Sequence, residues 1–599
     1  MRSNSPNTQA TVSTIDQQIE ALLAKLPDRN RPSFSPQLIA LRRRRNALLP
    51  IYQLPVELLL SILQRHLHQT QILGRHYSRL LQLSLVSTLF KSLVEDGSEL
   101  WACIGAGLSI RGVEVCLVKS SNQPLTINLD STKYAVYVEQ GRGYVMHNHN
   151  WEQYSEVKRT YEKDFVDRVL PHFSRVRVAS LKIGAESWDS IQTVLDSPAP
   201  LLVKFKIEGT GQGPFNLPPL NGADAFSGGA PRLKVLNIGK EFHFLADSYK
   251  FSGLSSLSIW SDKTLTVHKI ITMLSDSPNL SSLTIIEWMT TRGLDPSLAM
   301  KIIDGTARDQ IDFPILLPKL QDLTLRLEGA ERILYLLEHF QGPSCTHLDL
   351  RHGRTTAPPH FVQQSLRPFL PAFTHTHGWT DMSVNLGPLS WFRCEDGPSV
   401  CIQTSSDTLE SPVQVTSLLD WIIEARGNQT STIEMGLFLR EQGVRVDCSR
   451  PELLTRLQRL GRIVTLILDG STSTQEWMRK LMEPNWPTPN ETPRFFLPDL
   501  VSLYLSGFTK PGKDIMEVLQ VRYGKSPVPT GCQPQHLPPP LQLLKIGGPS
   551  LGSYTRAVKD IVGERNVKVS KYNFISFDIP VGLQSIPLAI NGPDVPHNF

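Results

Sequence analysis

The chain lacks the features that would place it among membrane proteins or disulfide-rich secreted proteins. No apolar run approaches the roughly twenty residues that span a bilayer, and residues 1–10 are polar, without the apolar segment of a signal peptide. The seven cysteines are scattered, odd in number and never in C-x-x-C spacing, so neither a disulfide framework nor a zinc ribbon is expected. These absences predict a cytoplasmic or nuclear protein with reduced thiols and no membrane partner.

The chain also lacks a strong charge bias. Its 61 basic and 56 acidic side chains leave a net charge of +5, too even a balance to indicate a nucleic-acid partner. The basic run Arg42 to Arg45 predicts a solvated helix face, with a nuclear-import or nucleic-acid patch as the alternative. With 40% apolar and 20% charged residues over 599 positions, we expect a folded chain built as several domains or an extended repeat array.

No catalytic or metal-binding pattern stands out in the sequence. The glycine-rich stretch 209–213 lacks the Lys-Ser/Thr of a phosphate-binding loop and predicts a turn. The histidine pairs at 147 and 149 and at 375 and 377 have no cysteine or carboxylate at a recognised metal-ligand spacing. We therefore predict no catalytic residue, no metal ligand and no cofactor, and the chain is not expected to be an enzyme.

A short helical module is predicted between residues 51 and 105. Pro55 is suited to the first turn of a helix, and Glu57 to the positive end of the helix dipole. Apolar residues then cover a broad arc of that helix, and a second helical run from Leu80 to Leu93 is also too apolar for one narrow face. Asp96-Gly97 predicts a break in the chain. Two such short helices cannot bury all of each other's apolar surface. The module must therefore bury the rest of that surface against another part of the chain or against another protein.

This order of residues resembles the F-box. The resemblance rests on the L-P-x-E-L start at Leu54, the L-x-L-V-x-x-x-F run that ends at Phe90 and the L-W-x-x-I segment from Leu100 to Ile104. A basic helix upstream and leucine-rich repeats downstream are also similar to F-box proteins abundant in mushroom-forming fungi. The sequence departs from many relatives at 88–90, where Thr-Leu-Phe replaces Cys-Arg-Trp.

The resemblance implies a role as the substrate receptor of an SCF-type ubiquitin ligase. In such an assembly the F-box helices pack against a Skp-type linker protein, which joins them to the cullin, and the receptor binds an unknown protein substrate. Carried over position by position, the adaptor-binding residues would be Leu54, Pro55, Leu58, Ile62, Leu63, Val86 and Phe90. The alternative is that these residues pack on the downstream part of the same chain.

A motif of the form L-x-x-L-x-I/L recurs along the rest of the chain. Examples are Leu254, Leu257 and Ile259; Leu280, Leu283 and Ile285; and Leu320, Leu323 and Leu325. Two units share a lead-in from a helix-like segment through Asp-Ser-Pro into a strand, at 191–198 and 271–278. This repetition resembles an irregular leucine-rich-repeat solenoid, an α/β fold with a parallel sheet, although its spacing of about twenty to forty residues is wide.

These patterns divide the chain into five predicted regions. Residues 1–50 form a tail and an amphipathic basic helical segment, 51–105 the F-box-like docking module, and 106–170 a transition region. Residues 171–550 form the solenoid, and residues 551–599 form a C-terminal cap and tail. The solenoid contains an irregular stretch at 351–450, with strand-like segments at 382–386 and 399–403, that is either an insertion or degenerate repeats. We favour degenerate repeats, because Leu418 to Ala425 and Ile433 to Leu439 look helical or amphipathic again.

The polar residues between the core leucines predict a substrate-binding surface on the outer face of the sheet. The residues assigned to it are Lys204, Lys206, Lys234, Asn237, Ser256, Ser282 and Thr284. Their basic and hydroxyl character favours polar recognition of a folded or modified protein, and simple solvation is the alternative. Two other functions stay open: a leucine-rich-repeat scaffold with no role in ubiquitin transfer, and an enzyme whose polar cluster is assembled from distant repeats.

Overall fold

The computed structural model divides the chain into two compact units, Met1–Ser248 and Tyr249–Phe599. The structure describes residues 6–25, 36–71, 76–105, 108–130, 151–184, 188–209, 226, 229–239, 253–261, 267–287, 314–327, 329–352, 360–374, 382–386, 389–394, 398–403, 411–426, 434–440, 456–457, 459, 462–469, 484–485, 494–495, 499–506, 516–517, 519–520, 541–547 and 552–570.

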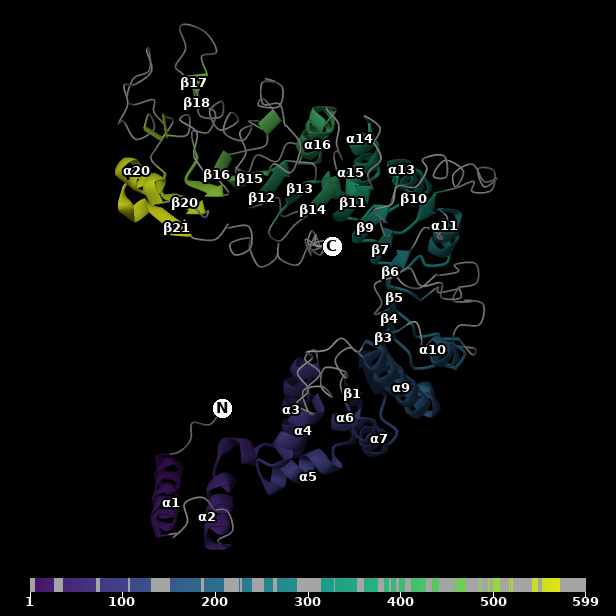
Figure 1. Cartoon of the computed structure of the whole chain (residues 1–599), viewed down its shortest axis with the longest axis vertical. Helices are drawn as coiled ribbons and strands as arrows, with labels where there is room; N and C mark the ends of the chain where they lie inside the picture. The colour runs from purple at the N-terminus through teal and green to yellow at the C-terminus, as the bar shows by residue number, and fades with distance from the viewer. Residues whose placement is uncertain are drawn as a thin grey trace. The chain divides into compact units, whose positions relative to one another are not determined.

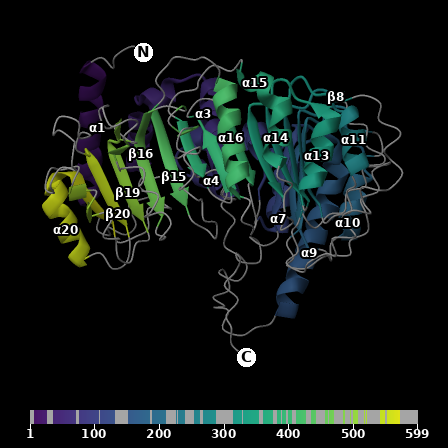
Figure 2. The same ribbon diagram turned by 90° about the horizontal axis from the view of Figure 1, so that it is seen from above.

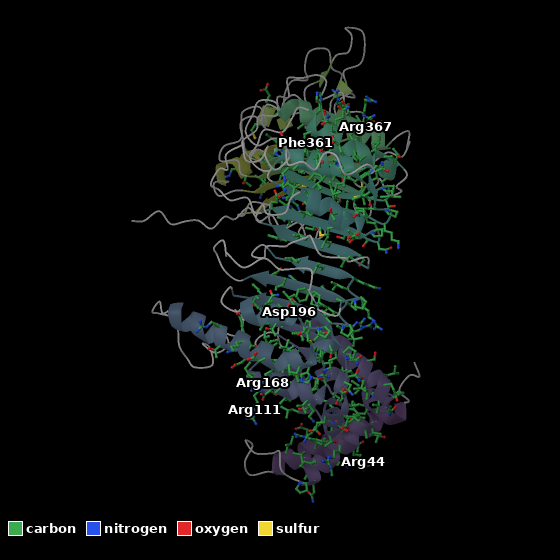
Figure 3. The ribbon with its side chains drawn as sticks, turned by 90° about the vertical axis from the view of Figure 1, so that its right-hand side faces the viewer. Arg44, Arg111, Arg168, Asp196, Phe361 and Arg367 are labelled. Atoms are coloured by element: carbon green, nitrogen blue, oxygen red, sulfur yellow. The ribbon has the colours of Figure 1, made fainter. Side chains whose placement is uncertain are left out.

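Two helices form a small hairpin near the N-terminus. They are α1 (Pro6–Lys25) and α2 (Pro36–Ala47), so the first helix begins before Ile15, where its apolar pattern starts. Ile15, Ile19 and Leu38 are buried between the helices, and an Arg45 Nε–Asp16 Oδ1 ion pair of 2.5 Å joins them. The basic residues 42–44 are exposed, and Figure 3 shows Arg44 on the hairpin. Three of the four arginines of the run are therefore exposed, and Arg45 pairs with Asp16.

The predicted docking module consists of short helices packed together. They are η2 (Pro50–Gln53), α3 (Val56–Gln71), α4 (His76–Ser84), α5 (Thr88–Asp96) and α6 (Ser98–Trp101). The predicted break at Gly97 is present between α5 and α6. Glycine is needed there because an added Cβ would lie 2.6 Å from the Leu93 carbonyl oxygen and 3.0 Å from a Leu60 methyl.

The second helical run of this module is divided in two, where a single helix was expected. Its division is explained by Ser87, whose hydroxyl accepts a hydrogen bond of 3.2 Å from the Phe90 backbone N–H and caps the N-terminus of α5. A serine that caps a helix start satisfies one of the N–H groups that have no partner within the helix.

Replacing Ser87 by alanine is expected to destabilise the module by about 1 kcal/mol, because the α5 N-terminus loses this cap. Hydrogen exchange of the α5 amides measures the change. Ser92→Ala is a control inside the same helix: Ser92 is exposed and donates to Asp96 rather than to the backbone. Equal protection of α5 in the two variants would contradict the capping role.

The first unit continues into a parallel sheet of order β1-β2-β3-β4-β5. Strand β2 already belongs to this sheet, although it lies in the predicted transition region 106–170, before the predicted start of the solenoid at residue 171. The helices between the strands contribute Val113, Phe165 and Ile191 to the buried core. The strands are β1 (Cys103–Ile104), β2 (Leu125–Asp130), β3 (Val176–Ile183), β4 (Lys204–Gly209) and β5 (Val235–Ile238), and the helices are α7 (Ile110–Lys119), α9 (Trp151–Val169), η3 (Leu170–Arg175) and α10 (Trp188–Leu195).

The second unit is built on a longer sheet, whose strand order is β6-β7-β9-β11-β14-β13-β12-β15-β16-β19-β20-β21. Neighbouring strands are parallel except where β13 pairs with β12 and β14. Figure 2 shows β15, β16, β19 and β20 side by side. The strands are β6 (Ser256–Ser261), β7 (Ser282–Glu287), β9 (Asp322–Leu327), β11 (His347–His352), β12 (Met382–Leu386), β13 (Leu389–Arg393), β14 (Ser399–Gln403), β15 (Glu434–Arg440), β16 (Arg462–Asp469), β19 (Ser502–Ser506), β20 (Leu543–Gly547) and β21 (Val567–Ser570).

Helices of the second unit cover one face of this sheet (Figure 1). They are α11 (Val267–Ser275), α13 (Ala330–His339), α14 (Phe361–Leu366), η8 (Arg367–Phe369), α15 (Leu370–Thr374), α16 (Ser411–Arg426), α20 (Gly552–Val562) and η10 (Glu564–Asn566). Short pairs β8 (Ile315–Leu316) with β10 (Phe340–Gln341), and β17 (Pro484–Asn485) with β18 (Arg494–Phe495), complete the described strands. No helix in the described part of the chain is long and apolar enough to cross a membrane.

The core leucines of the repeats stack in register. Leu257, Leu283 and Leu323 pair across β6, β7 and β9, and all three are fully or nearly fully buried. Polar residues alternate with them and lie on the face away from the helices, because successive side chains of a strand point to opposite faces. The α/β class and the parallel sheet are thus confirmed.

The irregular stretch 351–450 contains the one reversal of direction seen among the described strands of the long sheet of the second unit. The predicted strands at 382–386 and 399–403 are present as β12 and β14, with antiparallel β13 between them. The expectation of a helical or amphipathic segment at 433–439 is corrected, since 434–440 is strand β15. Its residues pair in register with both β12 and β16, and this pairing on two sides fixes the extended conformation.

Candidate functional site

Helix α3 divides its apolar side chains between two faces. Leu59, Leu63 and Leu67 are buried, whereas Leu58 and Ile62 are 53% and 48% exposed. Leu54 is half-buried and Pro55 is exposed just before the helix. Leu58 and Ile62 are one helical turn apart, so they are neighbours on the helix surface. Because the core of the chain does not cover them, they are available to a partner protein.

A second group of exposed apolar residues lies on and just after α4. Val86 is 56% exposed, Leu85 is 84% exposed, and Leu81 one turn earlier is also exposed. Helix α3 packs against α4, and only residues 72–75 connect them, so the start of α3 and the end of α4 lie at the same end of the helix pair. We define the exposed apolar patch as Val56, Leu58, Ile62, Leu81, Leu85 and Val86.

Sequence reasoning missed Val56, Leu81 and Leu85 as members of this patch. The signal was available, because the run from Leu80 to Leu93 contains more apolar residues than one helix face can bury. What the sequence could not show was which of them the module's own core would cover.

Two of the predicted contact residues lie in the interior of the module. Leu63 is 4% exposed and Phe90 is 6% exposed, so neither has surface to offer a partner in this conformation. The Phe90 ring packs against Tyr52, with 5.8 Å between ring centroids. We therefore assign Leu63 and Phe90 to the support of the patch, since a core residue positions its neighbours without contacting what they bind.

Polar contacts to backbone carbonyls fix the helices beneath the patch. The Trp101 indole N–H donates to the Val94 carbonyl oxygen at 2.6 Å, and His76 Nε2 lies 2.8 Å from the Leu100 carbonyl oxygen. The rings of Tyr77 and Trp101 also meet edge to face at 6.1 Å. These contacts tie α4, α5 and α6 together, so the apolar patch is displayed on a packed support.

The residues of the patch fall within a segment that comparison with known families identifies. Residues 51–105 match the F-box-like family. The F-box-like segment contains α3, α4, α5, α6 and β1, and all members of the apolar patch as defined here. The match confirms the F-box resemblance expected from the sequence and indicates in general terms a ubiquitin-ligase adaptor. Comparison with curated proteins found no match to this chain.

In the first unit, three of the predicted recognition residues lie on the neighbouring strands β4 and β5, and Lys234 directly precedes β5. Lys206 pairs with Asn237 in the strand register, and Lys204 and Lys234 are exposed. The Lys206 ammonium lies 2.6 Å from a Glu208 carboxylate oxygen, so part of the predicted positive charge is already neutralised within the chain. Partly exposed pairs of this kind contribute little stability, and both groups stay accessible to solvent.

In the second unit, the predicted hydroxyl residues form rows across the strands. Ser282 pairs with Ser256 on one side and Asp322 on the other, and Thr284 lies between Ser258 and Thr324. They are half-buried, except for the exposed Asp322, and alternate with the buried leucines. The residues of the predicted surface are thus divided between the two units.

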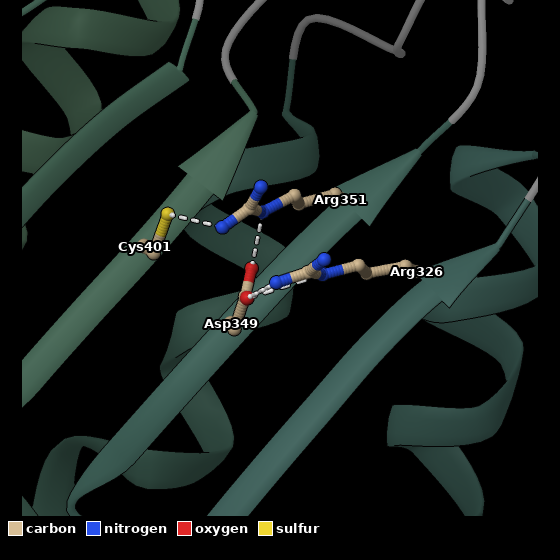
Figure 4. Close-up of polar contacts among 4 residues, drawn as sticks. All are labelled: Arg326, Asp349, Arg351 and Cys401. Atoms are coloured by element: carbon tan, nitrogen blue, oxygen red, sulfur yellow. Dashed lines mark hydrogen bonds and ion pairs between the residues drawn. The ribbon is translucent and has the colours of Figure 1, made fainter. Parts of the chain in front are cut away.

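A charged cluster in the second unit continues these rows and was not predicted. Arg326, Asp349, Arg351 and Cys401 come from β9, β11 and β14 and make polar contacts with one another (Figure 4). Arg326 and Asp349 are 23 residues apart and Arg351 and Cys401 are 50 apart, although Asp349 and Arg351 are only two apart, so no local pattern could have revealed the whole cluster.

The described cysteines are buried and protonated at neutral pH. Burial raises the pKa of Cys103, Cys116 and Cys401 to about 12 in each case, and raises that of Cys345 further. A buried thiol with a raised pKa is a poor nucleophile. The histidine pairs at 147/149 and 375/377 lie outside the described residues, as does most of 209–213. Within the described ranges, no group of three or more His, Cys, Asp or Glu is placed to hold a metal.

Proposed function

We propose that this protein is a substrate-recognition adaptor of an SCF-type ubiquitin ligase. The F-box-like segment docks on a Skp-type linker protein, and the parallel sheet, which we assign to an irregular leucine-rich-repeat array, binds the target protein. The chain itself catalyses no step, since ubiquitin transfer belongs to its partners. The observation that carries this proposal is the exposed apolar patch within the residues that match the F-box-like family.

The physical argument concerns surface that the chain leaves uncovered. Contiguous exposed apolar side chains on a soluble protein mark an interaction surface, because covering them gains about 25 cal/mol per Å² of apolar area removed from water. Leu58 and Ile62 lie exposed on α3, and Leu85 lies exposed directly after α4. Exposed apolar residues on a helix suit an apolar groove or an incomplete helix bundle of a partner.

Replacing Leu58 by aspartate is expected to lower affinity for a Skp-type linker by at least about 100-fold. The carboxylate would be buried without a partner at an apolar contact, which costs several kcal/mol, and about 2.7 kcal/mol corresponds to a factor of 100. The measurement is binding of the purified linker to the full chain. Gln64→Asp is the matched control, because Gln64 is an exposed polar residue of the same helix and receives the same new charge.

Equal affinity of the Leu58→Asp and Gln64→Asp variants, with unchanged circular dichroism, would remove Leu58 from the interface. Failure of the unaltered chain to bind any Skp-type linker would favour the alternative, a leucine-rich-repeat scaffold outside ubiquitin transfer.

A further inference from the structure

Two arginines on the sheet of the second unit share a single carboxylate. Asp349 Oδ2 accepts hydrogen bonds from Arg326 Nη2 at 2.7 Å and Nε at 3.2 Å, while Oδ1 accepts one from Arg351 Nε at 2.6 Å. Arg351 Nη2 also lies 3.6 Å from the Cys401 sulfur (Figure 4). Asp349 thus holds both guanidinium groups in fixed positions on one face of the sheet.

The strand register explains why these side chains meet. Arg351 pairs directly with Arg326, and Asp349 pairs with Thr324 on one side and Cys401 on the other. Neighbouring strands lie about 4.8 Å apart, and residues two apart on a strand share a face. The cluster therefore lies on the same face as the polar rows that contain Thr284 and Thr324, away from the buried leucines.

Among the residues that the structure describes, the cluster carries an excess of one positive charge. Two guanidinium groups face one carboxylate, and Cys401 cannot supply the missing negative charge because burial keeps its thiol protonated. The nearest acid in the preceding row is Asp322, which lies 3.5 Å from His347. Both of those side chains are about half exposed, so water screens their charges.

This excess charge is partly withdrawn from water. The side chains of Arg326, Asp349 and Arg351 are only 21%, 17% and 15% exposed. In the register, Ile286 and then Trp260 extend the row beyond Arg326, and both are half-buried apolar residues. Coulomb interactions are stronger in such surroundings than in open solvent, so a matching anion would be attracted more strongly than by isolated surface arginines.

We propose that Arg326 and Arg351 bind a carboxylate carried by the partner protein. A single carboxylate balances the excess charge, whereas a phosphate dianion would reverse it. The planar guanidinium group presents paired N–H donors that suit the two oxygens of a carboxylate. The hydroxyl groups of Thr284 and Thr324 lie on the same face beside the cluster and suit the polar backbone of an extended segment. The inference rests on the proposed function in one respect, that the partner is the protein recognised for ubiquitin transfer.

The test measures binding of the full chain to immobilised peptides with random flanking residues. The first set carries a central glutamate and the second a central glutamine, and the C-termini of both sets are amidated. The third set carries a central glutamine and a free C-terminal carboxylate. A preference of about tenfold for a carboxylate set over the amidated glutamine set is expected, and the preferred set identifies the source as a side chain or a chain end. Arg326→Gln and Arg351→Gln should each abolish the preference.

Arg456→Gln is the matched control. Arg456 also makes a 2.6 Å ion pair with an aspartate, Asp420, and its side chain is 26% exposed, but this pair involves one cation and one anion. The control should keep the preference. Binding without preference among the three sets would overturn the proposal, and so would a fourth set with central phosphoserine bound tenfold better than glutamate. Linker binding, assayed separately, distinguishes this outcome from failure of the proposed function. Hydrogen exchange of the β9 and β11 amides reports that the second unit of each variant is folded.

Discussion

Replacing Glu287 by leucine is expected to destabilise the second unit by about 3–5 kcal/mol. Glu287 lies at the end of β7 and its carboxylate Oε1 accepts a hydrogen bond from Arg332 Nη1 of α13. Their side chains are only 1% and 4% exposed. The substitution would leave the buried guanidinium without this carboxylate, and the desolvation cost of the charge would be offset less than in the unaltered chain.

Hydrogen exchange of the β7 and α13 amides measures this loss within the second unit. Asp420→Leu is the control, because it breaks an ion pair whose side chains are 48% and 26% exposed, and such pairs contribute about 0–1 kcal/mol. The double variant Glu287→Leu with Arg332→Leu is expected to be less destabilised than Glu287→Leu alone, since it removes both charges. A single variant as stable as the double would mean that Arg332 does not depend on Glu287.

The second large effect is expected from Leu283→Ala, at about 2–5 kcal/mol. Leu283 is fully buried and lies between Leu257 and Leu323 in adjacent strands. Its truncation removes apolar contacts and leaves a cavity that the sheet cannot close without shifting the neighbouring strands. Hydrogen exchange across β6, β7 and β9 again reports the change.

Thr284→Ala is the matched control for this prediction, because Thr284 follows Leu283 on the same strand and points to the opposite face. Its truncation is expected to cost less than about 1 kcal/mol. Ser281 would be a poorer control, since its hydroxyl donates a 2.8 Å hydrogen bond to the Ser255 carbonyl oxygen. Similar losses of protection for Leu283→Ala and Thr284→Ala would contradict the assignment of the two faces.

In the repeat region, the periodicity of apolar residues predicted the buried strand positions but not the type of every element. The spacing of Leu257 and Ile259, repeated at Leu283 and Ile285, predicted buried strand positions, and the structure pairs them in register. The segment at 433–439 was misjudged, because a short apolar run fits a helix or a strand equally well until its neighbours are known. Pairing of β15 with β12 and β16 decides its conformation.

For the docking residues, the sequence predicted the segment but not which of its apolar side chains are exposed. The order of Leu54, Pro55, Leu58 and Phe90 in the sequence was enough to predict an F-box-like segment, which the family comparison matches at 51–105. It was not enough to separate Leu58, which is exposed, from Leu63, which is buried. Both are leucines on one helix, and only the packing of α3 against its neighbours distinguishes them.

The sequence by itself determined the α/β class, the positions of the core leucines and the location of the F-box-like segment. These properties depend on local periodicity and on the order of residues along the chain. The tertiary structure decided which apolar residues remain uncovered and which charged residues meet, as Arg326, Asp349 and Arg351 do. Those outcomes depend on strand register and helix packing between distant segments, and a one-residue change of register would send the same side chains to the other face.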